Sequence, residues 1–212
     1  MRRRLLDIYE TLLAFFGPQG WWPGDTPLEI LVGAVLTQNT NWINVSKAIA
    51  NLRHDNLLAL DTLTGLPPVV LAEKIRPSGY YNLKAERLQN LLRHISARAG
   101  SVEAFFNTGE TAAIREELLS IRGIGPETAD SILLYAGGKP VFVVDAYTHR
   151  ILNRHGLIGD EAEYHELQAL FMDHLPEEAD LFNEYHALLV RTGKEFCKKS
   201  TPRCDDCPLK GF

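Results

Sequence analysis

Three cysteines near the end of the chain are the residues whose types and spacing most directly suggest chemistry. Cys197, Cys204 and Cys207 are the only cysteines in 212 residues, and all three lie within the last sixteen. A disulfide framework needs partners distributed through the chain, and a structural zinc site takes four ligands at other spacings. The cluster therefore predicts free thiols in a reducing cytoplasm.

A glycine-containing turn between two helical patterns is the second candidate site. We expect one helix to end at Arg122 and the next to begin at Pro126, with Gly123-Ile124-Gly125 as a tight turn between them. Backbone N–H groups at the start of the second helix would point outward and bind an anionic oxygen such as a DNA phosphate. The alternative is an ordinary helix turn, because Gly-x-Gly is a common pattern.

With the residues around this hairpin, the chain resembles the helix-hairpin-helix DNA glycosylases of the endonuclease III superfamily. The matching residues are, in chain order, Gly123, Gly125, Gly138, Pro140, Asp145, Thr148, Arg150 and Asn153. Further matches are LTQNT at 36–40 and RPSGYYNLKAERL at 76–88, so the resemblance covers essentially the whole chain. It implies an all-α, two-lobed fold with a central cleft for DNA, and a damaged base that is rotated out of the duplex.

Asp145 follows an apolar run at 141–144, which is expected to bury its backbone. Cleavage of an N-glycosidic bond passes through a sugar with oxocarbenium character, and a nearby carboxylate stabilises that charge or activates a water. The resemblance assigns this catalytic role to Asp145. An aspartate is also a good N-cap for a helix beginning at Ala146, and the two roles are compatible.

Family members that also cleave the DNA backbone carry a lysine shortly after the hairpin glycines, and its amine forms a Schiff base with the sugar. The matching position in this chain is Glu127, and a carboxylate cannot form an imine. The resemblance therefore implies a monofunctional glycosylase without strong lyase activity, with Glu127 as a second carboxylate of the catalytic site. The alternative for Glu127 is a solvent-exposed acid in the first turn of a helix.

A flipped base leaves a hole in the duplex that the enzyme must fill. By resemblance, Gln38 in LTQNT is inserted near the vacated space, and residues 122–125 of the hairpin contact the DNA. The alternative for Gln38 is a polar residue that ends the preceding buried helix.

All three tryptophans of the chain flank one buried apolar segment: Trp21 and Trp22 precede Pro23, and Trp42 follows LTQNT. With Glu127 at the lysine position, this combination is similar to the 3-methyladenine DNA glycosylase branch of the superfamily, the MagIII type. That resemblance implies stacking of the base on Trp21 and Trp42, with Trp22 and Pro23 as the pocket wall. A cationic alkylated purine stacks favourably on electron-rich rings. The alternative is that these large aromatics belong to the core.

The endonuclease III family holds a 4Fe–4S cluster with four cysteines spaced C-x6-C-x2-C-x5-C. Cys197, Cys204 and Cys207 match the first three ligands, and the fourth falls at position 213, immediately after Phe212. The resemblance implies a cluster at this segment. Three alternatives stay open: a fourth ligand beyond Phe212, a cluster with three protein thiolates, or a cluster that has been lost, as in some members of the methyladenine branch.

The elements that position these residues are predicted to be helices almost throughout. Apolar stripes and Gly or Pro punctuation indicate a first helix ending at Phe16, a buried helix over 28–36, and helices over 146–155, 161–174 and 177–192. Further segments begin near Trp42, Asn56, Pro67, Asn82 and Val102. The short run VFVVD at 141–145 has no partner strand in the sequence and is expected to be a buried connector. We therefore expect no sheet.

Two lobes follow from the family fold. One comprises 28–138 and contains the helix-hairpin-helix at 118–136; the other combines 1–27 with 139–212 and ends in the cysteine segment.

The composition agrees with a folded globular chain: 45% of the residues are hydrophobic and 23% are charged. The formal charge of −5 argues against a protein that coats nucleic acid indiscriminately, and no window is apolar enough to span a bilayer. We therefore expect a monomeric cytoplasmic, nucleoid-associated enzyme of base excision repair that acts on alkylated purines in double-stranded DNA. The alternatives are a mismatch or oxidised-pyrimidine glycosylase with lyase activity, and a non-catalytic helix-hairpin-helix DNA-binding protein.

Overall fold

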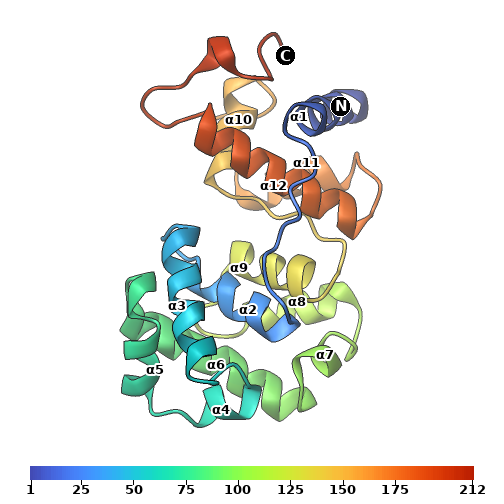
Figure 1. The fold of residues 1–212 in the computed structure, drawn as a ribbon. Coiled ribbons are helices and arrows are strands. Elements are labelled where there is room, and N and C mark those ends of the chain that lie inside the picture. The colour runs from blue at the N-terminus through green and yellow to red at the C-terminus, as the bar shows by residue number, and fades with distance from the viewer. The chain divides into compact units, whose positions relative to one another are not determined.

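The computed structural model describes all 212 residues, and every regular element in it is helical. The chain forms two compact units, one comprising Met1–Trp22 with Pro140–Phe212 and the other Pro23–Lys139. Each unit is described by itself below and can be followed in Figure 1. The prediction of an all-α fold is confirmed.

The unit of residues 23–139 is built around one buried helix. Its elements are α2 (Pro27–Leu36), α3 (Trp42–His54), α4 (Leu60–Gly65), α5 (Pro68–Lys74), η1 (Arg76–Ser78), α6 (Tyr81–Ala99), α7 (Val102–Phe105), α8 (Thr111–Leu119), α9 (Pro126–Ser131) and η2 (Ile132–Ala136). Helix α2 is buried from Leu31 to Leu36 and packs against α3, α6 and η2. A helix that is apolar on every side must be covered on every side. The central position of α2 is therefore the one that its sequence predicts.

The helix α8 ends earlier than its sequence pattern suggests, at Leu119 rather than Arg122. Ser120, the C-cap, donates its N–H to the carbonyls of Glu116 and Glu117, and the chain leaves the helix there. Asn56 likewise begins no helix: it lies in a turn with φ 56°, and α4 starts at Leu60. In both places local turn geometry ends or delays a helix within a few residues of the expected position.

The unit of residues 1–22 and 140–212 contains α1 (Arg2–Phe16), α10 (Ala146–Arg154), α11 (Tyr164–Met172), α12 (Ala179–Glu195) and the short η3 (Cys204–Asp206). Its core is aromatic: Phe142 stacks on Phe171 with ring centroids 3.8 Å apart, and Phe182 and Tyr185 meet Phe142 edge-on. The buried hydroxyl of Tyr185 donates to the carbonyl of Leu5 at 2.8 Å. This contact fastens the first helix of the chain to the last.

The run at 141–144 is a buried connector without strand structure, as predicted. Its carbonyl at Phe142 accepts a hydrogen bond of 2.8 Å from the side chain of Gln168 on α11. The connector leads directly to Asp145, so the packing of Phe142 and the bond from Gln168 hold the backbone that presents this carboxylate.

None of the helices is long and apolar enough to cross a membrane.

Candidate active site

The carboxylate of Asp145 is held at the N-terminus of α10. One of its oxygens, Oδ1, accepts hydrogen bonds from the backbone N–H of Thr148 at 2.8 Å and from the Thr148 hydroxyl at 3.0 Å. Asp145 is thus the N-cap of α10, as its residue type predicts. Because Oδ1 makes both of these bonds, the second oxygen, Oδ2, is the one left for other chemistry.

The surroundings of Asp145 favour its charged form. Burial raises the pKa of a carboxyl group, but the contacts with His186 and the two hydrogen bonds from Thr148 outweigh burial and hold the pKa of Asp145 below its usual range. The Nε2 atom of His186 lies 3.6 Å from Oδ2. At neutral pH this arrangement provides an ionised carboxylate that is almost out of water, where it interacts strongly with a developing positive charge.

The distance between α10 and α12 is set by a glycine. A Cβ atom added at Gly193 of α12 would lie 2.3 Å from Cδ1 of Tyr147 on α10, well inside van der Waals contact. Gly193 follows His186 by seven residues, so both lie on the same face of α12. Close packing at Gly193 therefore brings that face of α12 toward the end of α10 that carries Asp145.

The predicted hairpin forms, but the backbone N–H groups of its three turn residues are not equally available to a ligand. Ile124 is buried and donates its backbone N–H to the carbonyl of Ile121 at 3.0 Å, so its amide is used inside the turn. No such bond is made by the amides of Gly123 and Gly125. These two N–H groups, and not all three, are the ones that a phosphate oxygen can reach.

A buried ion pair joins the two helices of the hairpin. Asp130 on α9 is fully buried, and both of its carboxylate oxygens accept hydrogen bonds from Arg115 on α8, at 2.6 and 3.0 Å. A bidentate arginine–carboxylate pair fixes orientation as well as distance. The hairpin is therefore held as a rigid corner.

Gln38 is bound to the hairpin by its side chain. Its Nε2 donates to the carbonyl of Gly123 at 3.1 Å and to Oγ1 of Thr128 at 2.9 Å, and its Oε1 accepts from Nη1 of Arg87 at 2.6 Å. Arg87 also packs on Gly123, where any Cβ would collide with it. The end of α2, the hairpin and α6 are thus joined through one amide.

The loop that carries Gln38 has a second support, the buried amine of Lys84. This amine donates to the carbonyl of Leu36 at 2.9 Å and to that of Ser78 at 2.6 Å. Burial, with a smaller effect from the charge of Arg87, lowers the pKa of Lys84 to about 8. The two hydrogen bonds satisfy carbonyls at the end of α2 and in η1 that would otherwise be buried without donors.

The two charged side chains predicted near the hairpin are both exposed. Glu127 lies in the first turn of α9, and Nη1 of Arg122 lies 3.5 Å from a carboxylate oxygen of Glu86. An exposed acid beside the hairpin glycines carries no amine with which an imine could form.

The predicted pocket residues are distributed over both units. Trp21 and Trp22 lie in the unit of α1 and α12, half-buried, with ring centroids 5.0 Å apart. Pro23 begins the other unit and is exposed, and Trp42 starts α3 and is half-buried. None of the three tryptophans is fully buried, as a core residue would be.

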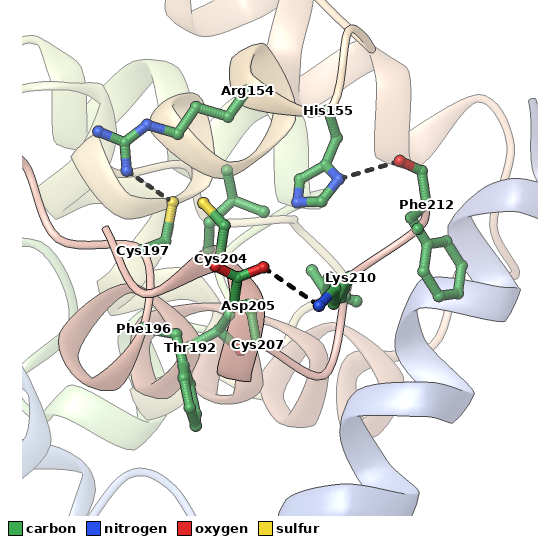
Figure 2. A pocket seen from close by; sticks show the side chains of 13 residues that line it. Arg154, His155, Thr192, Phe196, Cys197, Cys204, Asp205, Cys207, Lys210 and Phe212 are labelled. Carbon is green, nitrogen blue, oxygen red and sulfur yellow. Dashed lines mark hydrogen bonds and ion pairs between the residues drawn. The ribbon is translucent and has the colours of Figure 1, made fainter. Parts of the chain in front are cut away.

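The three cysteines line a single cavity of about 280 Å³ beside α10 and α12. Figure 2 shows the sulfur atoms of Cys197 and Cys204 directed toward the same space. Nη1 of Arg154 lies 3.2 Å from Sγ of Cys197, and such a donor stabilises a thiolate. His155, on the rim, lies with Nδ1 3.3 Å from the carbonyl oxygen of Phe212.

The donor set fits a cluster better than a single ion. No three His, Cys, Asp or Glu side chains lie close enough together to hold one metal ion, whereas a 4Fe–4S cluster is larger and takes widely separated thiolates. Burial raises the pKa of the Cys207 thiol, and the charges of Cys197 and Cys204 raise it further. Three thiolates around one cavity would therefore need a cation that compensates their charge.

Sequence patterns did not indicate three of the residues described above, Lys84, Arg87 and His186. Lys84 and Arg87 lie in the segment 76–88 that carried the family resemblance, but a charged residue in a helix is ordinarily assigned to the solvent face. Lys84 lies four residues before Leu88, on the buried stripe of α6. Its helical spacing from Leu88 is the sequence signal from which its burial could have been predicted. His186 has no comparable local signal, because its contact with Asp145 spans 41 residues of sequence.

Comparison with known families gives a match over most of the chain. Residues 32–177 match the sequence profile described as HhH-GPD superfamily base excision DNA repair protein. The MJ1434 protein of Methanocaldococcus jannaschii, named as a DNA repair glycosylase, is 48% identical over 98% of this chain and 94% of its own. Endonuclease III of Thermotoga maritima is 32% identical over 87% of this chain and 81% of its own.

Solved structures share the fold. The 3-methyladenine DNA glycosylase (MagIII) of H. pylori, in a crystal structure with 1,N6-ethenoadenine, is 34% identical with a TM-score of 0.78; the similarity covers 90% of this chain and 97% of that one. A non-covalent endonuclease III–DNA complex matches with a TM-score of 0.82 over 99% of this chain and 93% of that one, at 23% identity. The endonuclease III-like fold predicted from the sequence is therefore confirmed.

The close packing at Gly193 yields a testable prediction. Gly193→Ala places a methyl group against the ring of Tyr147, and overpacking of this kind costs about 1–3 kcal/mol of unfolding free energy. Urea unfolding measures the loss. Gly159→Ala is the matched control, because a Cβ at Gly159 meets nothing within 4 Å. Equal stability of the two variants would contradict the packing described.

Proposed function

Because the chain belongs to the HhH-GPD superfamily of base excision DNA repair proteins, we propose that this DNA glycosylase removes alkylated purines, such as 3-methyladenine, from double-stranded DNA. The observation that carries the proposal is the ionised carboxylate of Asp145, whose side chain is only 13% exposed. Two findings support the alkylated purine as the base. The MagIII glycosylase at 34% identity acts on 3-methyladenine and was crystallised with an ethenoadenine, and Glu127 stands where lyases of the family carry lysine.

The first step is DNA binding through the hairpin. The amides of Gly123 and Gly125, which make no hydrogen bond within the protein, donate to phosphate oxygens, and exposed Arg122 adds positive charge. These contacts read no base sequence. A repair enzyme needs this property, because damage occurs in any sequence.

The second step is exposure of the damaged base. Gln38 leaves its bonds to Gly123 and Thr128 and enters the space that the base vacates, so that its amide meets the bases left in the stack. The family resemblance assigns the half-buried rings of Trp21 and Trp42 to stacking on the base, and Trp22 and Pro23 to the wall of its pocket. Stacking on electron-rich rings favours a base with a formal positive charge over a neutral one.

The third step is cleavage of the glycosidic bond. An N3- or N7-alkylated purine leaves as a neutral base, so it requires little protonation by the enzyme. The electron deficit that develops on the sugar is stabilised by Asp145, whose carboxylate is fixed by Thr148 and cannot be screened well by water. Water then adds to C1′ of the sugar cation and loses a proton to the solvent, and the product is an abasic site.

We expect Asp145→Asn to abolish catalysis while keeping the fold. Asparagine caps a helix as well as aspartate does, so α10 should stay intact, but the charge that stabilises the sugar cation is lost. Release of 3-methyladenine from methylated duplex DNA should fall by about 10²–10³-fold, with the melting temperature nearly unchanged. Glu163→Gln, at the N-cap of α11 in the same unit, is the control and should retain activity. Normal release by Asp145→Asn would refute the assignment.

The residue at the lyase position generates a second prediction. Incubation with an abasic duplex and borohydride should leave no covalent protein–DNA adduct, because Glu127 cannot form an imine. Glu127→Lys restores an amine at this position and serves as the positive comparison. An adduct with the natural protein would show that another amine acts as a lyase nucleophile.

We propose further that Cys197, Cys204 and Cys207 bind a 4Fe–4S cluster in their shared cavity. When bound, the cluster supplies covalent cross-linking of the C-terminal segment. Arg154 donates a hydrogen bond to the sulfur of Cys197 at 3.2 Å.

Metal analysis tests the cluster directly. Protein purified without oxygen should contain about four iron atoms and four acid-labile sulfides per chain, and Cys204→Ser should lose most of both. Protein that contains no iron under these conditions, yet folds and releases base, would contradict the cluster.

A further inference from the structure

His186 is a buried titratable residue that the steps above do not use. It lies on α12, only 6% exposed, and its Nε2 atom is 3.6 Å from Oδ2 of Asp145. This is the oxygen that remains after Thr148 has occupied Oδ1. Each oxygen of the carboxylate thus faces a different partner.

We propose that His186 is a positioning residue for Asp145: it directs Oδ2 and keeps the carboxylate charged for its action on the sugar. This inference rests on the proposed function, in which Asp145 stabilises the sugar cation. His186 contacts the reacting atoms only through Asp145.

The need for such a partner follows from the burial of Asp145. Removing a carboxylate from water disfavours its ionised form, and an uncompensated buried carboxylate takes up a proton. Thr148 supplies two donors, but both go to Oδ1. An N–H directed at Oδ2 completes the compensation and fixes the rotation of the carboxylate plane, which the Oδ1 bonds alone define less tightly.

Contacts of two other residues on α12 fix the position of His186. One residue before it, Tyr185 fastens α12 to α1 through the bond to the Leu5 carbonyl. Seven residues after it, Gly193 admits Tyr147 of α10. A separation of 3.6 Å is long for a hydrogen bond, and contacts of catalytic groups commonly tighten once the substrate is bound.

The experiment compares two substitutions that differ in one donor. His186→Leu fills the space without an N–H, and His186→Gln returns an amide N–H near the position of Nε2. Base release is measured in a single turnover with enzyme in excess over methylated duplex, together with the Kd for the same DNA. His174→Gln, on a histidine bonded to the carbonyl of Leu170 in the same unit, is the matched control.

We expect His186→Leu to slow base release by about tenfold or more while the Kd changes little, and His186→Gln to recover most of the rate. A role in packing alone would lower stability in both variants without this difference in rate. Normal release by His186→Leu, or equal slowing in both variants while His174→Gln is unaffected, would overturn the proposal.

A measurement without DNA separates this proposal from the proposed function. Urea midpoints of Asp145→Asn, His186→Leu and the double variant form a cycle that reports the coupling of the two side chains. Non-additive shifts support the pairing even if the protein releases no 3-methyladenine, an outcome that refutes only the proposed function. Additive shifts would refute the pairing even if Asp145→Asn is inactive.

Discussion

The proposed chemistry of this protein depends on one carboxylate that stays charged although it is largely shielded from water. Burial works against the charge of Asp145, and the opposing contacts come from two elements: Thr148 within α10 and His186 on α12. This requirement explains why α10 and α12 approach so closely that the contact point on α12 is glycine. It also explains why a buried connector, held by the aromatic core, leads into the capping residue.

In the other unit, side chains from three elements hold the loop that carries Gln38 in place. Gln38 is held by three hydrogen bonds, two of them to the hairpin and one from Arg87. The backbone just before it is anchored by Lys84. The hairpin proposed to bind phosphate and the residue proposed to enter the duplex therefore share direct hydrogen bonds. The buried pair of Arg115 and Asp130 keeps the hairpin itself from deforming.

In the cysteine segment, the sequence spacing and the three-dimensional geometry give separate evidence for the proposed cluster site. The spacing of Cys197, Cys204 and Cys207 matches three ligands of the family cluster, whereas the cavity adds that the thiols face a common space with a donor from Arg154. Burial first, and then the charges of Cys197 and Cys204, raise the pKa of the Cys207 thiol, so holding all three as thiolates would require a compensating positive charge.

The sequence by itself determined the helical class, the buried α2, the strandless connector, the hairpin turn and the N-cap at Asp145. These features depend on residues within a few positions of one another, so periodicity and turn chemistry suffice to predict them. Only the tertiary structure decided that the amide of Ile124 is hydrogen-bonded inside the turn, that Gln38 is bonded to Gly123, and that His186 faces Asp145. Contacts of the last two kinds join residues 85 and 41 positions apart, and such pairs come together only when packed helices fix their distance.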